Sequence, residues 1–213
     1  LELSRRVLGE EHRDTLSSLH NLAVTCAVTG RPAEAEALFL KALEIQNRVL
    51  GEEHPDTARS MHSLAILYRE TGRLAEAEPL YREAMEINRR VLGHEHPTTL
   101  NSIASMANQY SAQRRNAEAI SLYLEALAKQ RRVLGGEHPG TLNTMVNLAM
   151  LYWRTGQHAE AEPLMREVME TRRRVLGDEH PDTLGSMRSL AHVYWKQGRL
   201  TEAEAMYRPA IEG

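Results

Sequence analysis

The triplet Val-Leu-Gly recurs along this chain at a constant interval. Its glycine returns every 42 residues, without insertion or deletion. The five positions are Gly9, Gly51, Gly93, Gly135 and Gly177. A fixed period of roughly 20–50 residues indicates a small structural unit stacked into an array, because one such unit cannot bury its own apolar face. We therefore predict a single repeat array over residues 1–213.

Each period contains the pattern of two helices. From Asp56 to Thr71, apolar residues recur every three or four positions, as on one buried helix face. Gly72 follows as a residue that tolerates positive φ and ends a helix. The segment 75–92 repeats the apolar pattern, with its acids early and its bases late, which suits the helix dipole. No alternating β-branched run competes, so the predicted fold class is all-α.

About five helix-turn-helix units follow from this register, with partial helices at both ends. Residues 1–8 read as the tail of a preceding second helix. The units are predicted at about residues 12–50, 54–92, 96–134, 138–176 and 180–213.

Small residues predict how the two helices of a unit pack. Alanine holds two equivalent positions in every copy, which implies close approach of the helix backbones. These residues are Ala23, Ala65, Ala107, Ala149 and Ala191 at one position, and Ala35, Ala77, Ala119, Ala161 and Ala203 at the other.

The single cysteine is predicted to fill the core. Cys26 takes the position that Tyr68 and its equivalents hold in later copies, and no chemistry recurs around it. One cysteine cannot form an internal disulfide, which fits a reducing compartment. We accordingly expect a cytoplasmic protein.

Composition excludes several classes of function. With 42% hydrophobic residues and a net charge of −3, the chain can bury a core, and it lacks the basic excess of a nucleic-acid-binding surface. It contains no run of about 18 apolar residues, so no membrane partner is expected. No phosphate-binding loop, nucleophile elbow or zinc-protease motif is present. We therefore expect no catalytic residue, no metal and no cofactor.

The linker RVLGEEHPDT at residues 48–57 contains two acids and a histidine, which raises the question of a metal or acid/base site. The histidine and the glutamate before it return once in every unit. A metal needs several ligands around one ion, whereas stacking would place these groups about one repeat apart. We predict a structural role, in which imidazole and threonine accept the free N–H groups that open the first helix, with proline at its first position.

One turn departs from the others. Arg114 stands where the other copies end their first helix with glycine. Because arginine disfavours positive φ, we predict a remodelled turn there.

The string LHNLAVTCAVTGRPAEAEALFLKAL at residues 19–43 resembles the tetratricopeptide repeat. The 42-residue period and the VLGEEHPDT linker are similar more narrowly to the repeats of kinesin light chains. The resemblance implies a right-handed α-α superhelix, a tetratricopeptide solenoid. It also implies a concave groove, lined by the first helices, that binds a peptide or partner protein without catalysis.

The same resemblance implies which residues line the groove. Asn21 and Asn147 hold a position where the family commonly uses asparagine to bind the backbone of an extended peptide. The kinesin light chain string L-N-N-L-A is kept in neither copy, because His20 and Val146 replace its first asparagine. This argues against binding of kinesin-type cargo motifs. The other groove positions are Arg59, Asn101, Asn143, His62, Asn108, Arg69, Arg154, Arg188, His192 and Lys196.

Two tryptophans occupy one equivalent position in the last two copies. Trp153 and Trp195 are interpreted either as binding anchors in the groove or as side chains packed between neighbouring units. Bases outnumber acids along this surface, so the expected ligand is a peptide with acidic and bulky apolar residues.

Two alternatives to a binding scaffold stay open. In the first alternative, the chain is a regulatory or oligomerising segment of a larger protein, for example one with a nucleotide-driven switch. Self-association through its uncapped ends is then expected. RNA binding by helical repeats is the second alternative, which the near-neutral charge disfavours.

Overall fold

The computed structural model describes residues 6–212, which form helices joined by short turns and contain no strand. The helices are α2(Arg13–Val28), α3(Pro32–Val49), α4(Pro55–Glu70), α5(Leu74–Leu92), α6(Pro97–Ala112), α7(Asn116–Val133), α8(Pro139–Arg154), α9(His158–Leu176), α10(Pro181–Lys196) and α11(Leu200–Glu212). The predicted all-α fold of repeated helix pairs is confirmed. Most of residues 1–8, predicted as the tail of a second helix, lie outside the described range.

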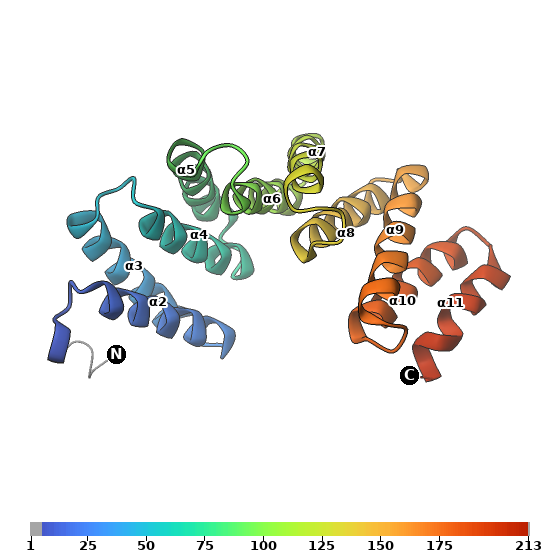
Figure 1. The fold of residues 1–213 in the computed structure, drawn as a ribbon, viewed down its shortest axis with the longest axis horizontal. Coiled ribbons are helices and arrows are strands. Elements are labelled where there is room, and N and C mark those ends of the chain that lie inside the picture. Colours follow the sequence, from blue (N-terminus) through green and yellow to red (C-terminus); the bar gives the residue numbers. More distant parts are fainter. Residues whose placement is uncertain (1–5, 213) are drawn as a thin grey trace. The chain divides into compact units, whose positions relative to one another are not determined.

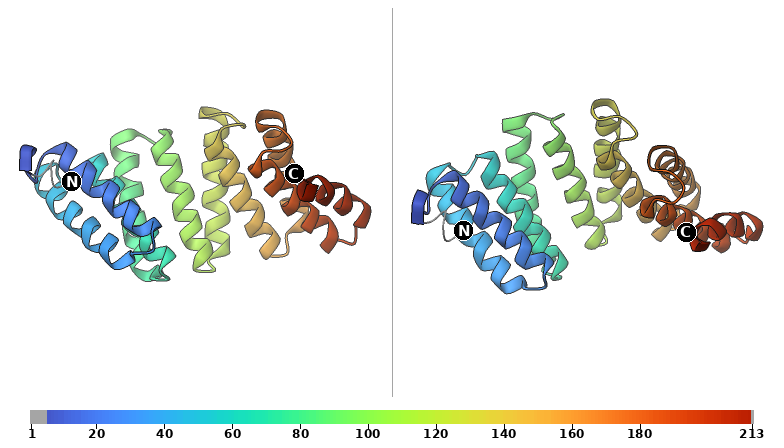
Figure 2. Two further views of the ribbon diagram at one scale, coloured as in Figure 1. Left: turned by 90° about the horizontal axis from the view of Figure 1, so that it is seen from below. Right: turned by 60° about the horizontal axis from the view of Figure 1, so that its bottom comes forward.

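The chain divides into two compact units, Leu1–Arg115 and Asn116–Gly213, which we call unit 1 and unit 2. In unit 1, α2 to α6 pack in chain order, each helix against the next (Figure 1). The first helices of successive copies also touch, α2 against α4 and α4 against α6. In unit 2, α7 to α11 pack in the same order (Figure 2). There α8 and α10 do not approach each other as closely as α4 and α6 do.

The repeated histidine begins each first helix. In α2, α4, α6, α8 and α10 its Nδ1 accepts a hydrogen bond from the backbone N–H two residues later, at 3.1–3.2 Å. Proline follows as the first helical residue in α4, α6, α8 and α10. The predicted capping role of the histidine is therefore confirmed, and it satisfies one of the free N–H groups of the first turn.

The threonine of the linker acts differently from the prediction. The Thr57 hydroxyl donates to the carbonyl of Gly51 at 3.0 Å, and Thr141 donates to Gly135 at 2.8 Å. The expectation that threonine accepts a helix N–H was wrong, because the carbonyl of the turning glycine has no helical donor and takes the hydroxyl instead.

The turn at Arg114 is a second correction. Arg114 has φ 62°, in the left-handed region that glycine occupies at Gly30, Gly72, Gly156 and Gly198. Its N–H bonds the carbonyl of Ser111 at 3.2 Å, and Arg115 bonds Tyr110 at 2.9 Å. Gly72 and Arg73 make the same two bonds, to Arg69 and Tyr68. The turn is therefore conserved in geometry, and the arginine carries the backbone strain.

The ten predicted alanine positions are buried. Nine of the alanines have no exposed surface, and Ala203 is 3% exposed. Cys26 is likewise fully buried as a free thiol, and burial raises its pKa. The core position of the cysteine is confirmed, and the burial of the alanines is what the predicted close packing requires.

A polar clamp joins one helix pair to the next. Tyr68 and Arg73 both bond the Glu36 carboxylate, at 2.9 and 2.6 Å, and the Arg73 guanidinium lies 4.0 Å from the Tyr68 ring centroid. Arg115 and Glu78 repeat this pairing at 3.0 Å, and Arg199 and Glu162 repeat it at 2.9 Å.

The clamp is absent at one junction. In α7 the glutamate is replaced by Ile120, and in the turn after α8 the arginine is replaced by Gln157. Both charged partners are lost together, which leaves neither charge unpaired.

We predict that Arg114→Gly stabilises the protein. A non-glycine residue in the left-handed region costs on the order of 1 kcal/mol, which glycine would relieve. The midpoint of urea unfolding should rise. The matched control is Gly72→Arg, which places the same strain in an equivalent turn and should lower the midpoint. Equal midpoints for Arg114→Gly and the parent chain would contradict the strain.

We also predict that His54→Ala destabilises α4. Loss of a side-chain N-cap costs about 1 kcal/mol, measured by the same unfolding experiment. His54→Asn supplies another capping acceptor and should recover most of that loss. If His54→Asn is as unstable as His54→Ala, the imidazole contributes by packing rather than by capping.

Candidate functional site

The predicted binding residues all lie on the first helices, outside the alanine contact. Nine are exposed and five are partly buried. The exposed ones are Asn21, Arg59, Asn101, Asn143, Arg154, Arg188, His192, Trp195 and Lys196. The partly buried ones are His62, Arg69, Asn108, Asn147 and Trp153.

In unit 1, three of these residues border one hollow. Arg59 and His62 on α4 and Asn101 on α6 lie around a space of about 440 Å³, and Asn88 on α5 forms part of its lining. Asn21 is not among the residues that line this space. The hollow lies between two first helices and is backed by a second helix.

His62 is the most buried of the predicted residues in this hollow. Its Nε2 lies 2.9 Å from the Ser105 hydroxyl, and its ring meets Tyr81 edge-on at 5.4 Å between centroids. Burial, followed by the nearby Arg69 charge, lowers the pKa of His62 to about 4. The imidazole is therefore neutral at pH 7 and serves as a packed, hydrogen-bonded ring.

Asn88 leaves an acceptor without a partner in the wall of the same hollow. The side chain is 3% exposed, and its Nδ2 donates to Ser102 at 2.9 Å. Its Oδ1 accepts no hydrogen bond from any residue that the structure describes. A buried, unsatisfied carbonyl oxygen costs free energy.

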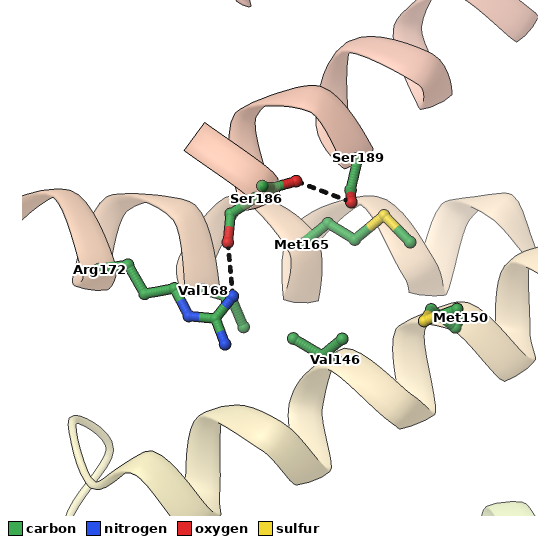
Figure 3. A pocket seen from close by; sticks show the side chains of 8 residues that line it. Val146, Met150, Met165, Val168, Arg172, Ser186 and Ser189 are labelled. Carbon is green, nitrogen blue, oxygen red and sulfur yellow. Dashed lines mark hydrogen bonds between the residues drawn. The ribbon is translucent and has the colours of Figure 1, made fainter. Parts of the chain in front are cut away.

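Unit 2 has a hollow at the equivalent place, with different chemistry. It measures about 80 Å³ and lies between α8 and α10 on a wall of α9. Figure 3 shows the side chains around it, and its lining comprises Val146, Met150, Met165, Val168, Arg172, Gly185, Ser186 and Ser189.

Comparison of equivalent positions explains why this hollow is apolar. Residues 84 positions apart, two periods, occupy the same place in the repeat. Val146 occupies the position of His62, and Met165 occupies the position of Tyr81. Both members of the edge-on ring pair of unit 1 are thus replaced by aliphatic side chains. Gly185 replaces Asn101, which removes a third polar side chain.

Arg172 holds the place of Asn88. Its Nη1 donates to the Ser186 hydroxyl at 2.8 Å and to the Asp182 carbonyl at 3.4 Å, as Figure 3 shows in part. No carboxylate among the described residues lies within salt-bridge distance of it.

Other arginines near the ends of the second helices do have acidic partners. Arg48 bonds Glu11 at 2.7 Å, Arg90 pairs with Glu53 at 3.1 Å, and Arg174 bonds Glu137 at 2.6 Å. The glutamate in each pair is the linker glutamate, so its role is structural as predicted. Arg172 therefore presents an uncompensated charge beside the hollow of unit 2.

The two tryptophans belong to an aromatic row in unit 2. The Trp153 ring lies 4.1 Å from His158 and 6.3 Å from His192, between centroids. His192 lies 5.7 Å from Trp195, whose ring carries the Lys196 ammonium at 4.7 Å. Trp153 is partly buried and packs on its neighbours, whereas Trp195 is 51% exposed. The packing interpretation fits Trp153, and a role of Trp195 as an anchor stays a prediction.

Two kinds of feature are absent from the described residues, 6–212. No three histidine, cysteine, aspartate or glutamate side chains converge there as a metal site would require. Within the same range, no helix has the length and apolar character needed to cross a bilayer.

A family model for the tetratricopeptide repeat matches residues 18–90, 67–108, 98–171 and 144–213. The chain belongs to the tetratricopeptide repeat family. This membership supports a protein–protein interaction scaffold in general, in a family that is generally non-catalytic. No curated protein sequence matches the chain.

Solved structures agree with the family. The chain is similar to the nearly identical tetratricopeptide-like repeats of a putative kinesin light chain from Podosopora anserina, with 33% identity and a TM-score of 0.80, covering 94% of this chain and 95% of that one. BtubC (BKLC) from P. vanneervenii aligns with a TM-score of 0.82 and 22% identity, over 99% of this chain and 84% of that one.

A third similar structure is a Rap protein complexed with Competence and Sporulation Factor. Its TM-score is 0.73 at 14% identity, over 98% of this chain and 60% of that one. At this identity the likeness shows the fold alone, as it does for BtubC.

Sequence reasoning missed Met165, Val168 and Arg172, which lie on a second helix of this tetratricopeptide protein. A signal was available for Met165. The other four copies place an aromatic ring at its position, in Phe39, Tyr81, Tyr123 and Tyr207. Loss of that ring in one copy marks the place, within unit 2, where a hollow opens between neighbouring helices.

The lowered pKa of His62 predicts a pH-dependent stability. Below about pH 6.5 the unfolded chain binds a proton on this ring, while the folded protein does so only near pH 4. The contribution of the neutral His62 ring to the free energy of unfolding is therefore fully present above about pH 6.5. It is lost as the pH falls toward 4, and the loss amounts to roughly 2–3 kcal/mol.

Urea unfolding of the parent and of His62→Val at pH 7 and pH 4.5 tests this loss. Valine is the residue at the equivalent position of unit 2, so the fold should accept it. The parent should lose more stability than the variant on acidification. An equal loss in both proteins would show that His62 does not titrate as an isolated buried ring.

Proposed function

We propose that this tetratricopeptide protein is a non-catalytic scaffold that binds an extended peptide or a peptide-like segment of a partner protein on its first helices. The family and its general role as an interaction scaffold support the proposal. The ligand class is a peptide with acidic and bulky apolar residues.

The observation that carries the proposal is the half-exposed Trp195 on α10. The equivalent position holds Ala27, Arg69 and Ser111 in the first three copies, so the fold does not require a ring there. An indole that is 51% exposed contributes little to the core. Tryptophan with an exposed face is a common anchor in protein interfaces.

Charge on the same helices supports the acidic character of the ligand. Helix α8 contains no aspartate or glutamate, and α10 contains only Asp182. The two helices together contain Arg154, Arg188 and Lys196. A positive surface attracts a negatively charged segment and orients it during the encounter.

Selection of random displayed peptides on the purified protein tests the proposal. Captured peptides should be enriched in acidic and bulky apolar residues. Trp195→Ala should weaken their binding about ten-fold, the effect expected for an exposed aromatic anchor. Asn147→Ala and Trp153→Ala are expected to weaken it as well.

The control is Glu170→Ala, an exposed residue of the second helix α9 outside the proposed surface. It should leave peptide binding unchanged. Peptides that bind all of these variants as tightly as the parent would show that the first helices do not form the binding surface.

A further inference from the structure

The hollow of unit 2 combines an apolar lining with an unpaired cation. Val146, Met165 and Val168 supply apolar surface, while the Arg172 guanidinium is held by Ser186 and not by a carboxylate. Figure 3 shows the Arg172 side chain reaching toward Ser186 along one side of this space. The exposed Arg188 on α10 has no acidic partner among the described residues either.

We infer that this hollow is a binding subsite for one aliphatic side chain, of leucine, isoleucine or methionine size, that neighbours an aspartate or glutamate in an extended peptide. The inference rests on the proposed function and specifies which part of the peptide binds in the hollow of unit 2. The apolar side chain enters between α8 and α10, and the neighbouring carboxylate pairs with Arg172.

The volume selects an aliphatic side chain over an aromatic one. A cavity of roughly 150 Å³ accommodates a benzene ring. The hollow of unit 2 measures about 80 Å³, about half of that. A branched or linear chain of a few carbons therefore matches this space better than an indole or phenol ring does. Met150 is 60% exposed at the rim and supplies a flexible thioether contact to such a chain.

Charge complementarity is the reason to expect an acidic residue beside the aliphatic residue of the peptide. In unit 1 the corresponding rim is balanced, because Arg59 lies 3.2 Å from Asp56 on its own helix. In unit 2 the cations Arg172 and Arg188 have no such partner. A partly buried guanidinium gains most from a carboxylate, which it binds by two hydrogen bonds in one plane.

Residues at the equivalent positions of other copies suggest substitutions that serve as negative controls. At the equivalent place of unit 1, the rings of His62 and Tyr81 meet edge-on in the positions of Val146 and Met165. Glutamine occupies the Arg172 position in two other copies, as Gln46 and Gln130. Val146→His and Arg172→Gln therefore introduce residues that this repeat accepts elsewhere.

The test measures the ε-methyl signals of ¹³C-labelled methionine in the full chain during titration with terminally blocked peptides. The peptides consist of glycine and serine around one pair of residues, which is Leu-Glu, Leu-Gln, Gly-Glu or Trp-Glu. We expect the Leu-Glu peptide to shift the signals of Met150 and Met165. The other three peptides should bind about ten-fold more weakly or not measurably.

Two variants separate the apolar and the charged contributions. Val146→His should abolish the shifts by closing the hollow. Arg172→Gln should weaken the Leu-Glu peptide about ten-fold but leave the Leu-Gln peptide unchanged. Circular dichroism of each variant checks that its helix content is kept.

The outcomes distinguish this subsite from the proposed function. If displayed peptides bind the protein but neither Val146→His nor Arg172→Gln weakens them, the scaffold function stands and the subsite is wrong. If the Trp-Glu peptide binds as well as the Leu-Glu peptide, the size selectivity is wrong and the inference is overturned. If neither displayed nor defined peptides bind, the proposed function and the subsite fail together.

Discussion

The burial of a small side chain at the alanine positions is the constraint on which the rest of this structure depends. Residues such as Ala65 and Ala77 are completely buried, and a larger side chain there would displace its neighbours. Because alanine is buried at both positions in every copy, each helix turns the same face to the core and exposes the same opposite face. The polar clamps and the linker caps then connect one pair to the next.

That repetition makes the differences between copies interpretable. The two hollows lie at equivalent places in the repeat, yet His62 borders one of them, whereas Val146 and Met165 line the other. The alanines of the surrounding helices are buried in both places, so that burial does not depend on the difference in chemistry. The same reasoning applies to the missing clamp at Ile120 and Gln157, where two charges are lost together and the helices still pack.

Much of the fold could be predicted because its signals are local. The turning glycines, the histidine caps and the helix lengths involve groups a few residues apart, and five copies repeat the same information. The pairing of Arg172 and the space beside it could not be predicted in this way. They depend on three helices whose contributing residues lie about 40 positions apart, and on which side chains leave room between them.

The sequence by itself determined the all-α class, the period, the capped starts of the first helices and the buried alanine faces, because each follows from local backbone preference and hydrophobic spacing. Only the tertiary structure decided the conformation of Arg114, where the bonds of the turn outweigh the preference of arginine for negative φ. It alone also decided that Trp153 packs while Trp195 is half-exposed, and that α8 and α10 leave a hollow. These depend on how neighbouring helices fill the space between them, which no single segment encodes.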